Sequence, residues 1–165
     1  MVSFFRCWLT GILLSLIKSN EEIREELMRV CADYYRNRSL REYRLWGNAD
    51  RLKIGLNVQI NNAILNTVSG SIEIGDNTFF GHSVSVLTGT HEASKINRER
   101  QLGVIIEGRN ISIGQGVWIA SNATILGPCT IGDHAVIGAG AVVTGDVPPC
   151  TLFAGMPAKM IKKIV

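Results

Sequence analysis

A chain of 165 residues fits a single domain, and its 46% hydrophobic content is enough to bury a core, which excludes an extensively disordered protein. The net charge of +3 is too small to favour a nucleic-acid partner, so we expect none. The four cysteines show no CxxC spacing and no pairing with histidine. This argues against a disulfide framework and a zinc site, and it predicts free thiols in a reducing cytoplasm.

The first fifty residues predict a short α-helical segment. An apolar run from Cys7 to Ile17 is shorter than the roughly 20 residues that span a bilayer, and its large side chains recur at helical spacing. This amphipathic face has two interpretations: packing against the rest of the protein or a sister subunit, which we favour, and peripheral membrane contact. A second amphipathic helix is predicted over residues 20–36, capped by Asn20, with one apolar stripe formed by Ile23, Leu27, Cys31 and Tyr34.

Further along the chain, an aliphatic residue returns every six positions. These residues are Ile113, Ile119, Ile125, Ile131, Ile137 and Val143, and a small or β-branched residue stands two places before each of them. No helix or ordinary strand alternation has this period, but alternation within short strands turns both positions inward. Three hexads make one coil of 18 residues. The repeat therefore predicts an all-β fold, a stacked parallel β-helix over residues 51–150, with a C-terminal tail over residues 151–165.

The six-residue register breaks directly after His91. A predicted loop at about residues 92–110 intervenes before the register resumes at Ile113. Stacked coils tolerate an insertion only at a corner, and long loops in compact domains are usually functional, so we interpret this loop as a wall of an acceptor site. Imidazole is the side chain best suited to accept a proton near neutral pH. A lone histidine is more often structural than catalytic, so His91, at the root of the loop, has two interpretations at this point: a structural residue and a general base.

Five segments carry a family resemblance: INNAILN, IGDNTFFGHSVSVLTGTHEA, ISIGQGVWIASNATI, IGDHAVIGAGAVVTGDVPP and AGMPAKMIKKI. From about residue 52 to its C-terminus the chain resembles the hexapeptide-repeat acetyltransferases, in particular the maltose and galactoside acetyltransferases and the polysaccharide O-acetyltransferases. The resemblance implies a left-handed β-helix and a homotrimer with active sites between subunits. It also implies acetyl-CoA as a co-substrate, with no tightly bound cofactor and no metal.

The same resemblance implies roles for individual residues. The run Thr88-Gly89-Thr90-His91 matches the motif whose histidine is the general base, and the Ser121 N–H matches the donor that stabilises the oxyanion. Acetyl-CoA contacts are expected at Trp118, Ser121, Ala139, Thr144, Lys159 and Lys162, with the two lysines binding the CoA phosphates. Acceptor contacts are expected at Asn61, Asn66, His82 and Glu92.

Two points about these residues stay open at the level of sequence. Either Glu92 or a backbone carbonyl orients the His91 ring through its second nitrogen. Asn61 and Asn66 are equally well interpreted as turn asparagines that satisfy backbone groups.

The predicted function is acetyl-CoA-dependent O-acetylation of a sugar or of a polysaccharide or lipopolysaccharide precursor in the cytoplasm. Two alternatives remain: an antibiotic or serine acetyltransferase of the same fold, and a non-acetylating β-helix protein such as a relative of the γ-type carbonic anhydrases. In the latter, histidines on neighbouring coils hold zinc. His82 and His134 fall in the second and fourth predicted coils, roughly 10 Å apart at about 4.8 Å per coil, so we expect both to be turn residues.

Overall fold

The computed structural model of the chain describes residues 15, 17–39 and 42–164, and it divides into two compact units, residues 1–39 and 40–165. The first unit contains helix α2 (Glu21–Ser39), which Asn20 caps, because its Oδ1 accepts a hydrogen bond from Ile23 N at 3.2 Å. Apart from residues 15 and 17, the apolar run from Cys7 to Ile17 lies outside the described residues. Within the described ranges, no helix has the length and apolar content to cross a membrane.

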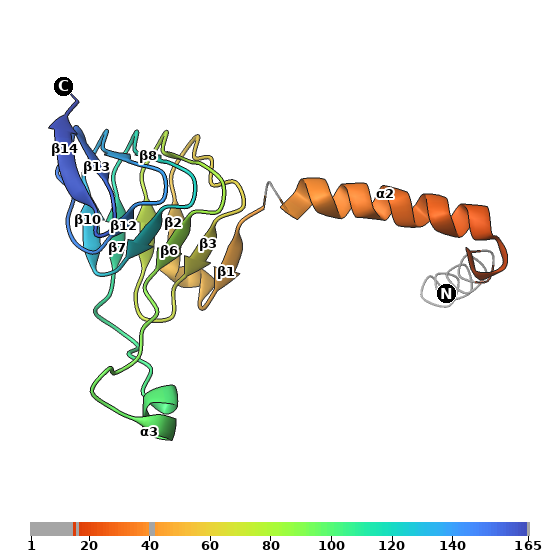
Figure 1. Cartoon of the computed structure of the whole chain (residues 1–165), viewed down its shortest axis with the longest axis horizontal. Helices are drawn as coiled ribbons and strands as arrows, with labels where there is room; N and C mark the ends of the chain where they lie inside the picture. Colours follow the sequence, from red (N-terminus) through yellow and green to blue (C-terminus); the bar gives the residue numbers. More distant parts are fainter. Residues whose placement is uncertain (1–14, 16, 40–41, 165) are drawn as a thin grey trace. The chain divides into compact units, whose positions relative to one another are not determined.

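The second unit is a β-helix whose short strands stack into three sheets (Figure 1). Sheet A contains β1 (Arg44–Trp46), β3 (Ile64–Asn66), β6 (Ser85–Leu87), β9 (Thr124–Leu126) and β12 (Val142–Val143). Sheet B contains β2 (Leu52–Ile54), β4 (Ile72–Ile74), β7 (Ile111–Ile113) and β10 (Cys129–Ile131). Sheet C contains β5 (Phe79–Phe80), β8 (Trp118–Ile119), β11 (Val136–Ile137), β13 (Thr151–Ala154) and β14 (Lys159–Lys163). The chain visits the sheets in the order B, C, A, so we name each corner by the two sheets that it joins.

The six-residue repeat builds the core. All six aliphatic positions from Ile113 to Val143 are buried, and so are the small or β-branched positions two residues before each of them. The strands align in parallel register, so that Ile74, Ile113 and Ile131 stand next to one another on successive strands of sheet B. Each coil thus covers the core residues of its neighbour. The predicted parallel β-helix and both of its inward positions are confirmed.

Tight corners join the sheets. Asn57, Asn61 and Asn77 have positive φ angles of 55°, 52° and 58°. Asparagine tolerates this left-handed conformation better than most residues. Asparagines in the early coils therefore form turns that a β-branched residue would strain.

One long loop and a terminal hairpin complete the unit. Between β6 and β7 the chain leaves an A–B corner, forms the short helix α3 (Asn97–Leu102) and returns, and Figure 1 shows this loop projecting from the coils. A short 3-10 helix (Ala49–Arg51) precedes β2. At the other end, β13 pairs in parallel with β11, and β14 pairs with β13 in the antiparallel direction at the edge of sheet C.

Candidate active site

His91 lies at the start of the loop, where two antiparallel limbs leave the coil. A β-bridge joins His91 to Val104, and Ile105 N donates a hydrogen bond to Thr90 O at 3.2 Å. The exposed His91 ring places Nδ1 2.9 Å from the carbonyl oxygen of Arg100. Because a carbonyl can only accept, Nδ1 carries the hydrogen, and in the neutral ring Nε2 keeps its lone pair. The loop therefore holds the imidazole in the tautomer that can take a proton at Nε2.

The orienting group in this structure is the Arg100 carbonyl, whereas the Glu92 carboxylate forms an ion pair with Lys95 at 3.0 Å. The Arg100 guanidinium folds back into the same loop and donates to the carbonyl oxygens of Lys95 and Ala93. These contacts fix the end of α3 that presents the carbonyl to the histidine. Sequence reasoning offered a backbone carbonyl as one of two orienting groups but did not identify Arg100, because no local motif marks a backbone contact made across a loop.

A buried hydrogen-bonded cluster anchors the root of the loop. Thr88 Oγ1 donates to Asn66 O at 2.8 Å and accepts from Ser69 N at 3.1 Å. Ser69 Oγ accepts from Thr90 N at 3.2 Å, and Arg109 Nε donates to Thr88 O at 2.9 Å. Thr88 and Ser69 are both fully buried. The backbone directly before the histidine is thus fixed by residues from a neighbouring coil and from the returning limb.

Asn66 lies at this same A–B corner. Its Oδ1 accepts a hydrogen bond from Val68 N at 3.0 Å, and a Cβ atom added at Gly89 would lie 2.6 Å from its Nδ2. The side chain therefore forms a local turn and fills the space beneath the TGTH segment. Its predicted acceptor role stays a prediction.

Four other predicted site residues, Asn61, His82, Ser121 and Ala139, stack at the opposite C–A corner. Ser121 Oγ accepts from His82 N at 3.1 Å, and Asn61 Nδ2 donates to Phe80 O at 2.7 Å. Among the hydrogen bonds of the described residues, none uses the Ser121 N–H as a donor.

Sheet A separates the two corners by about 16 Å, the length of five residues of extended chain. One chain therefore does not bring His91 and Ser121 together. Thr144 directly follows β12, at the A–B side of the sheet.

The outer face of sheet C carries Trp118, Lys159 and Lys162. Trp118 stacks on Phe79 with ring centroids 5.8 Å apart. Simple alternation would place the two lysines on opposite faces of β14, but a register shift lets Lys162 pair with Leu152 and Lys159 pair with Ala154. Paired residues point to the same side, so both lysines share the face on which Leu152 and Trp118 lie.

The other two histidines lie at different corners. His82 is at a C–A corner and His134 is at a B–C corner, where its φ is 58°. In the part of the chain that the structure describes, no group of three or more His, Cys, Asp and Glu side chains is arranged to hold a metal ion. These two histidines are turn residues in this structure.

Comparisons with known proteins connect these features. Residues 110–145 match the bacterial transferase hexapeptide (six repeats) family. The chain is 34% identical over 113 residues to a putative lipopolysaccharide biosynthesis O-acetyl transferase of Escherichia coli K12, covering 65% of this chain and 58% of that protein. Its structure resembles a galactoside acetyltransferase in complex with coenzyme A, with a TM-score of 0.66 and 33% identity over 73% of this chain and 59% of that one. A maltose O-acetyltransferase from Clostridium difficile 630 has a TM-score of 0.61 and 31% identity, over 88% of this chain and 77% of that one.

The chain belongs to the hexapeptide-repeat acetyltransferase family. Membership confirms the resemblance that the five sequence segments predict. The chain spans about half the length of the curated relatives that it matches, at 44%, 54% and 58% of the first three.

Proposed function

We propose that this chain is an acetyl-CoA-dependent O-acetyltransferase that acts on a hydroxyl of a sugar or of a polysaccharide or lipopolysaccharide precursor. One observation carries the proposal: the Arg100 carbonyl binds His91 Nδ1 and leaves Nε2 to act as a base at the root of the long loop. The relatives support the donor and acceptor classes, since one is a galactoside acetyltransferase complexed with coenzyme A and another is named for lipopolysaccharide biosynthesis.

In the proposed reaction, His91 Nε2 takes the acceptor hydroxyl proton while the oxygen attacks the thioester carbonyl carbon. The tetrahedral intermediate carries an oxyanion, and the unused Ser121 N–H supplies a preorganised donor for it. Collapse of the intermediate forms the acetyl ester and expels the CoA sulfur, which takes the proton from His91. No covalent enzyme intermediate is needed.

Because His91 and Ser121 occupy different corners of one chain, we propose that Ser121 of a second copy completes each site in a homotrimer. The outer face of sheet C supports such an assembly. Phe79 and Trp118 are 43% and 45% exposed there, and the half-buried Val136 and Leu152 continue the same apolar row. An exposed apolar row of this length favours contact with another protein surface.

The finer predictions are part of the same proposal. They include the left hand of the β-helix, the acetyl-CoA contacts of Ala139, Thr144, Lys159 and Lys162, and the acceptor contacts of Asn61, Asn66, His82 and Glu92. A cytoplasmic location is also included, with membrane contact through the N-terminal apolar run as the second interpretation.

The test is incubation of the full chain with radiolabelled acetyl-CoA and a panel of sugars, lipid-linked glycans, serine and chloramphenicol. We expect label in a sugar or glycan as a base-labile ester. Label in serine or chloramphenicol would contradict the acceptor class. Bound zinc together with no affinity for acetyl-CoA would contradict the reaction and favour the non-acetylating alternative.

A further inference from the structure

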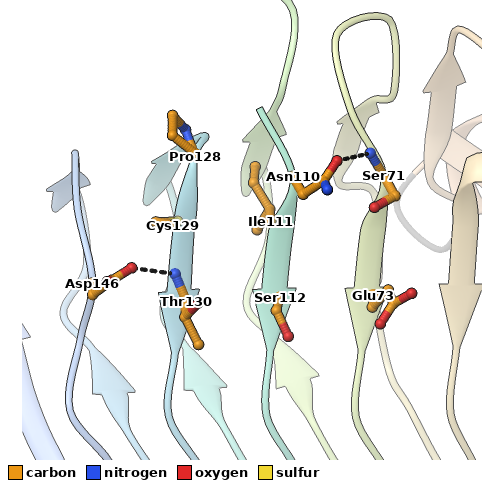
Figure 2. A pocket seen from close by; sticks show the side chains of 9 residues that line it. All are labelled: Ser71, Glu73, Asn110, Ile111, Ser112, Pro128, Cys129, Thr130 and Asp146. Carbon is orange, nitrogen blue, oxygen red and sulfur yellow. Dashed lines mark hydrogen bonds between the residues drawn. The ribbon is translucent and has the colours of Figure 1, made fainter. Parts of the chain in front are cut away.

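A polar pocket lies on the outer face of sheet B, outside every site described above. It has a volume of about 440 Å³, within the range of about 300–1,000 Å³ that is usual for small-molecule sites. Figure 2 shows its lining side chains on β4, β7 and β10, on the residues directly before these strands, and on the segment after β12. They are Ser71, Glu73, Asn110, Ile111, Ser112, Pro128, Cys129, Thr130 and Asp146.

This pocket continues toward the loop that carries His91. A second hollow of about 270 Å³ shares Ser71 and Asn110 with it and reaches Arg51, Ile106 and Glu107. Arg51 Nη1 donates to the carbonyl oxygens of Val68 and Ile106, each at 3.0 Å, and so fixes the returning limb at this point. We call the two hollows together the sheet B groove.

The end of the groove that Ile106 lines is close to the candidate base, His91. Ile106 stands two residues after Val104, which forms the β-bridge with His91. Two residues of extended chain span about 7 Å and the bridged pair adds about 5 Å, so the Ile106 backbone lies within about 12 Å of that of His91. A ligand bound in the groove can therefore extend to the proposed reaction centre at His91.

The lining offers free hydrogen-bonding groups of both kinds. Asn110 uses its oxygen to accept from Ser71 N at 2.9 Å, and Asp146 uses Oδ1 to accept from Thr130 N at 2.7 Å, as the dashed lines in Figure 2 mark. Among the described residues, the Asn110 nitrogen, Asp146 Oδ2 and the hydroxyl groups of Ser71, Ser112 and Thr130 have no hydrogen-bond partner. Such a mixture of donors and acceptors matches the hydroxyl groups of a sugar.

The charges of the groove favour neutral sugars over acidic ones. Glu73 is neutralised by Lys53 at 2.7 Å, while the Asp146 carboxylate has no ion pair among the described residues. Glu107 and Arg51 contribute one negative and one positive charge in the second hollow, so Asp146 gives the groove its net negative charge. A uronate or sulfate group would meet like charge at Asp146.

The groove also stays open in the proposed assembly. The outward residues of sheet B are polar, with Lys53, Glu73, Ser112 and Thr130 forming one exposed row, in contrast to the apolar row of sheet C. Because subunit contacts bury apolar rather than charged surface at their centre, we expect sheet B to face solvent in the proposed trimer.

We propose that the sheet B groove is a subsite for the neutral sugar residues that follow the acetylated one in an oligosaccharide or polysaccharide acceptor. This inference rests on the proposed function and narrows its acceptor class from any sugar to a glycan of several residues.

The experiment measures binding of fluorescent glycans of one to four residues, in a maltose series and an N-acetylglucosamine series, to the full chain without acetyl-CoA. We expect the tetrasaccharide of at least one series to bind at least about tenfold more tightly than its monosaccharide. Ser112→Trp fills the groove from an exposed strand position and should remove this gain. Gln115→Trp, which places the same side chain at an exposed position outside the groove, should keep it.

A second variant addresses charge without changing bulk. Asp146→Asn keeps the acceptor for Thr130 N, so the fold is preserved, and it should improve binding of a uronate tetrasaccharide relative to the neutral one by about tenfold. Equal affinity across chain lengths in both series, unchanged length dependence in Ser112→Trp, or tighter wild-type binding of the uronate would each overturn the subsite.

Acetyl transfer to the same glycans is measured separately. Length-dependent binding without any transfer would contradict the proposed function and leave the subsite standing. Acetyl transfer to monosaccharides, with binding that does not depend on glycan length, would support the proposed function and contradict the subsite.

Discussion

At the His91 ring, a single backbone contact selects the tautomer that the proposed reaction needs. The Arg100 carbonyl binds Nδ1, and the carboxylate that could have competed, Glu92, is held by Lys95. A carbonyl adds no charge to the imidazole, in contrast to a carboxylate partner. In the proposed reaction, the proton on His91 can therefore be passed on to the leaving sulfur without a strong ion pair retaining it.

Cys129 predicts a pH dependence of stability. Burial raises the pKa of its thiol from 9.0 to about 11, the nearby Asp146 carboxylate adds to this rise, and Arg109 lowers it. The thiol ionises in the unfolded chain near its ordinary pKa, so the folded state binds more protons between these values, and stability falls as the pH rises through this window. We expect the free energy of unfolding of the wild type to lose about 2 kcal/mol more than that of Cys129→Ala between about pH 8 and pH 11. Urea unfolding of both proteins measures this, and parallel pH curves would contradict it.

Lys159 and Lys162 predict an effect on acetyl-CoA affinity. Since the register shift in β14 places both on one face, the double variant Lys159→Glu, Lys162→Glu should raise the KM for acetyl-CoA at least about tenfold and leave kcat within about twofold. Lys163 pairs with the buried Thr151 and so points to the other side of the strand, which makes Lys163→Glu the matched control. An unchanged KM in the double variant would remove the lysines from the CoA site.

At the scale of elements, the loop depends on the coils beneath it. Thr88 connects the strand end at Asn66 with Ser69, and Ser69 in turn binds Thr90 N. The rigid β-helix thereby fixes the first residues of a loop that is exposed over most of its length.

Replacing Thr88 by Val should therefore affect both stability and turnover. Loss of the hydroxyl leaves the buried Ser69 N–H without its acceptor, which we expect to lower the free energy of unfolding by about 1–3 kcal/mol. It should also lower kcat more than it changes the KM for acetyl-CoA, because the backbone before His91 loses the hydrogen bonds that fix its position. Thr124→Val, at a half-buried strand position whose hydroxyl has no partner among the described residues, is the control. Equal behaviour of the two variants in denaturant titrations and steady-state kinetics would reject this role.

The six-residue period was sufficient to predict the core, because every inward position depends only on contacts with equivalent positions in the next coil. Ile54, which pairs with the inward Ile74, is 39% exposed, since β2 is the edge strand of sheet B. The shared face of Lys159 and Lys162 depends on a register shift that alternation does not encode. The Arg100 contact depends on how the loop folds back on itself, and the sheet B groove depends on how distant segments stack, so no local pattern could have located them.

At the scale of the whole molecule, each sheet presents a different surface. Sheet B is polar and bears the groove, and sheet C presents the apolar row that ends in lysines. The strands of sheet A separate the corner with His91 from the corner with Ser121. Such a division suits a protein whose sites form where one copy meets another.

The apolar row makes the assembly testable. Phe79→Glu places a charge next to Trp118 and should convert the proposed trimer to monomers with loss of turnover, as measured by sedimentation equilibrium and initial rates. Ser112→Glu introduces the same charge on sheet B and should leave the mass of the assembly in sedimentation equilibrium unchanged. A trimer that survives Phe79→Glu would move the interface away from sheet C.

The most direct test of the account is the turnover of His91→Ala with the best acceptor from the radiolabelled panel. We predict that kcat falls by about two to four orders of magnitude while the affinity for acetyl-CoA stays nearly unchanged. His134→Asn, at a turn histidine whose positive φ asparagine tolerates, should retain wild-type activity. Wild-type turnover by His91→Ala would contradict the assignment of His91 as the general base.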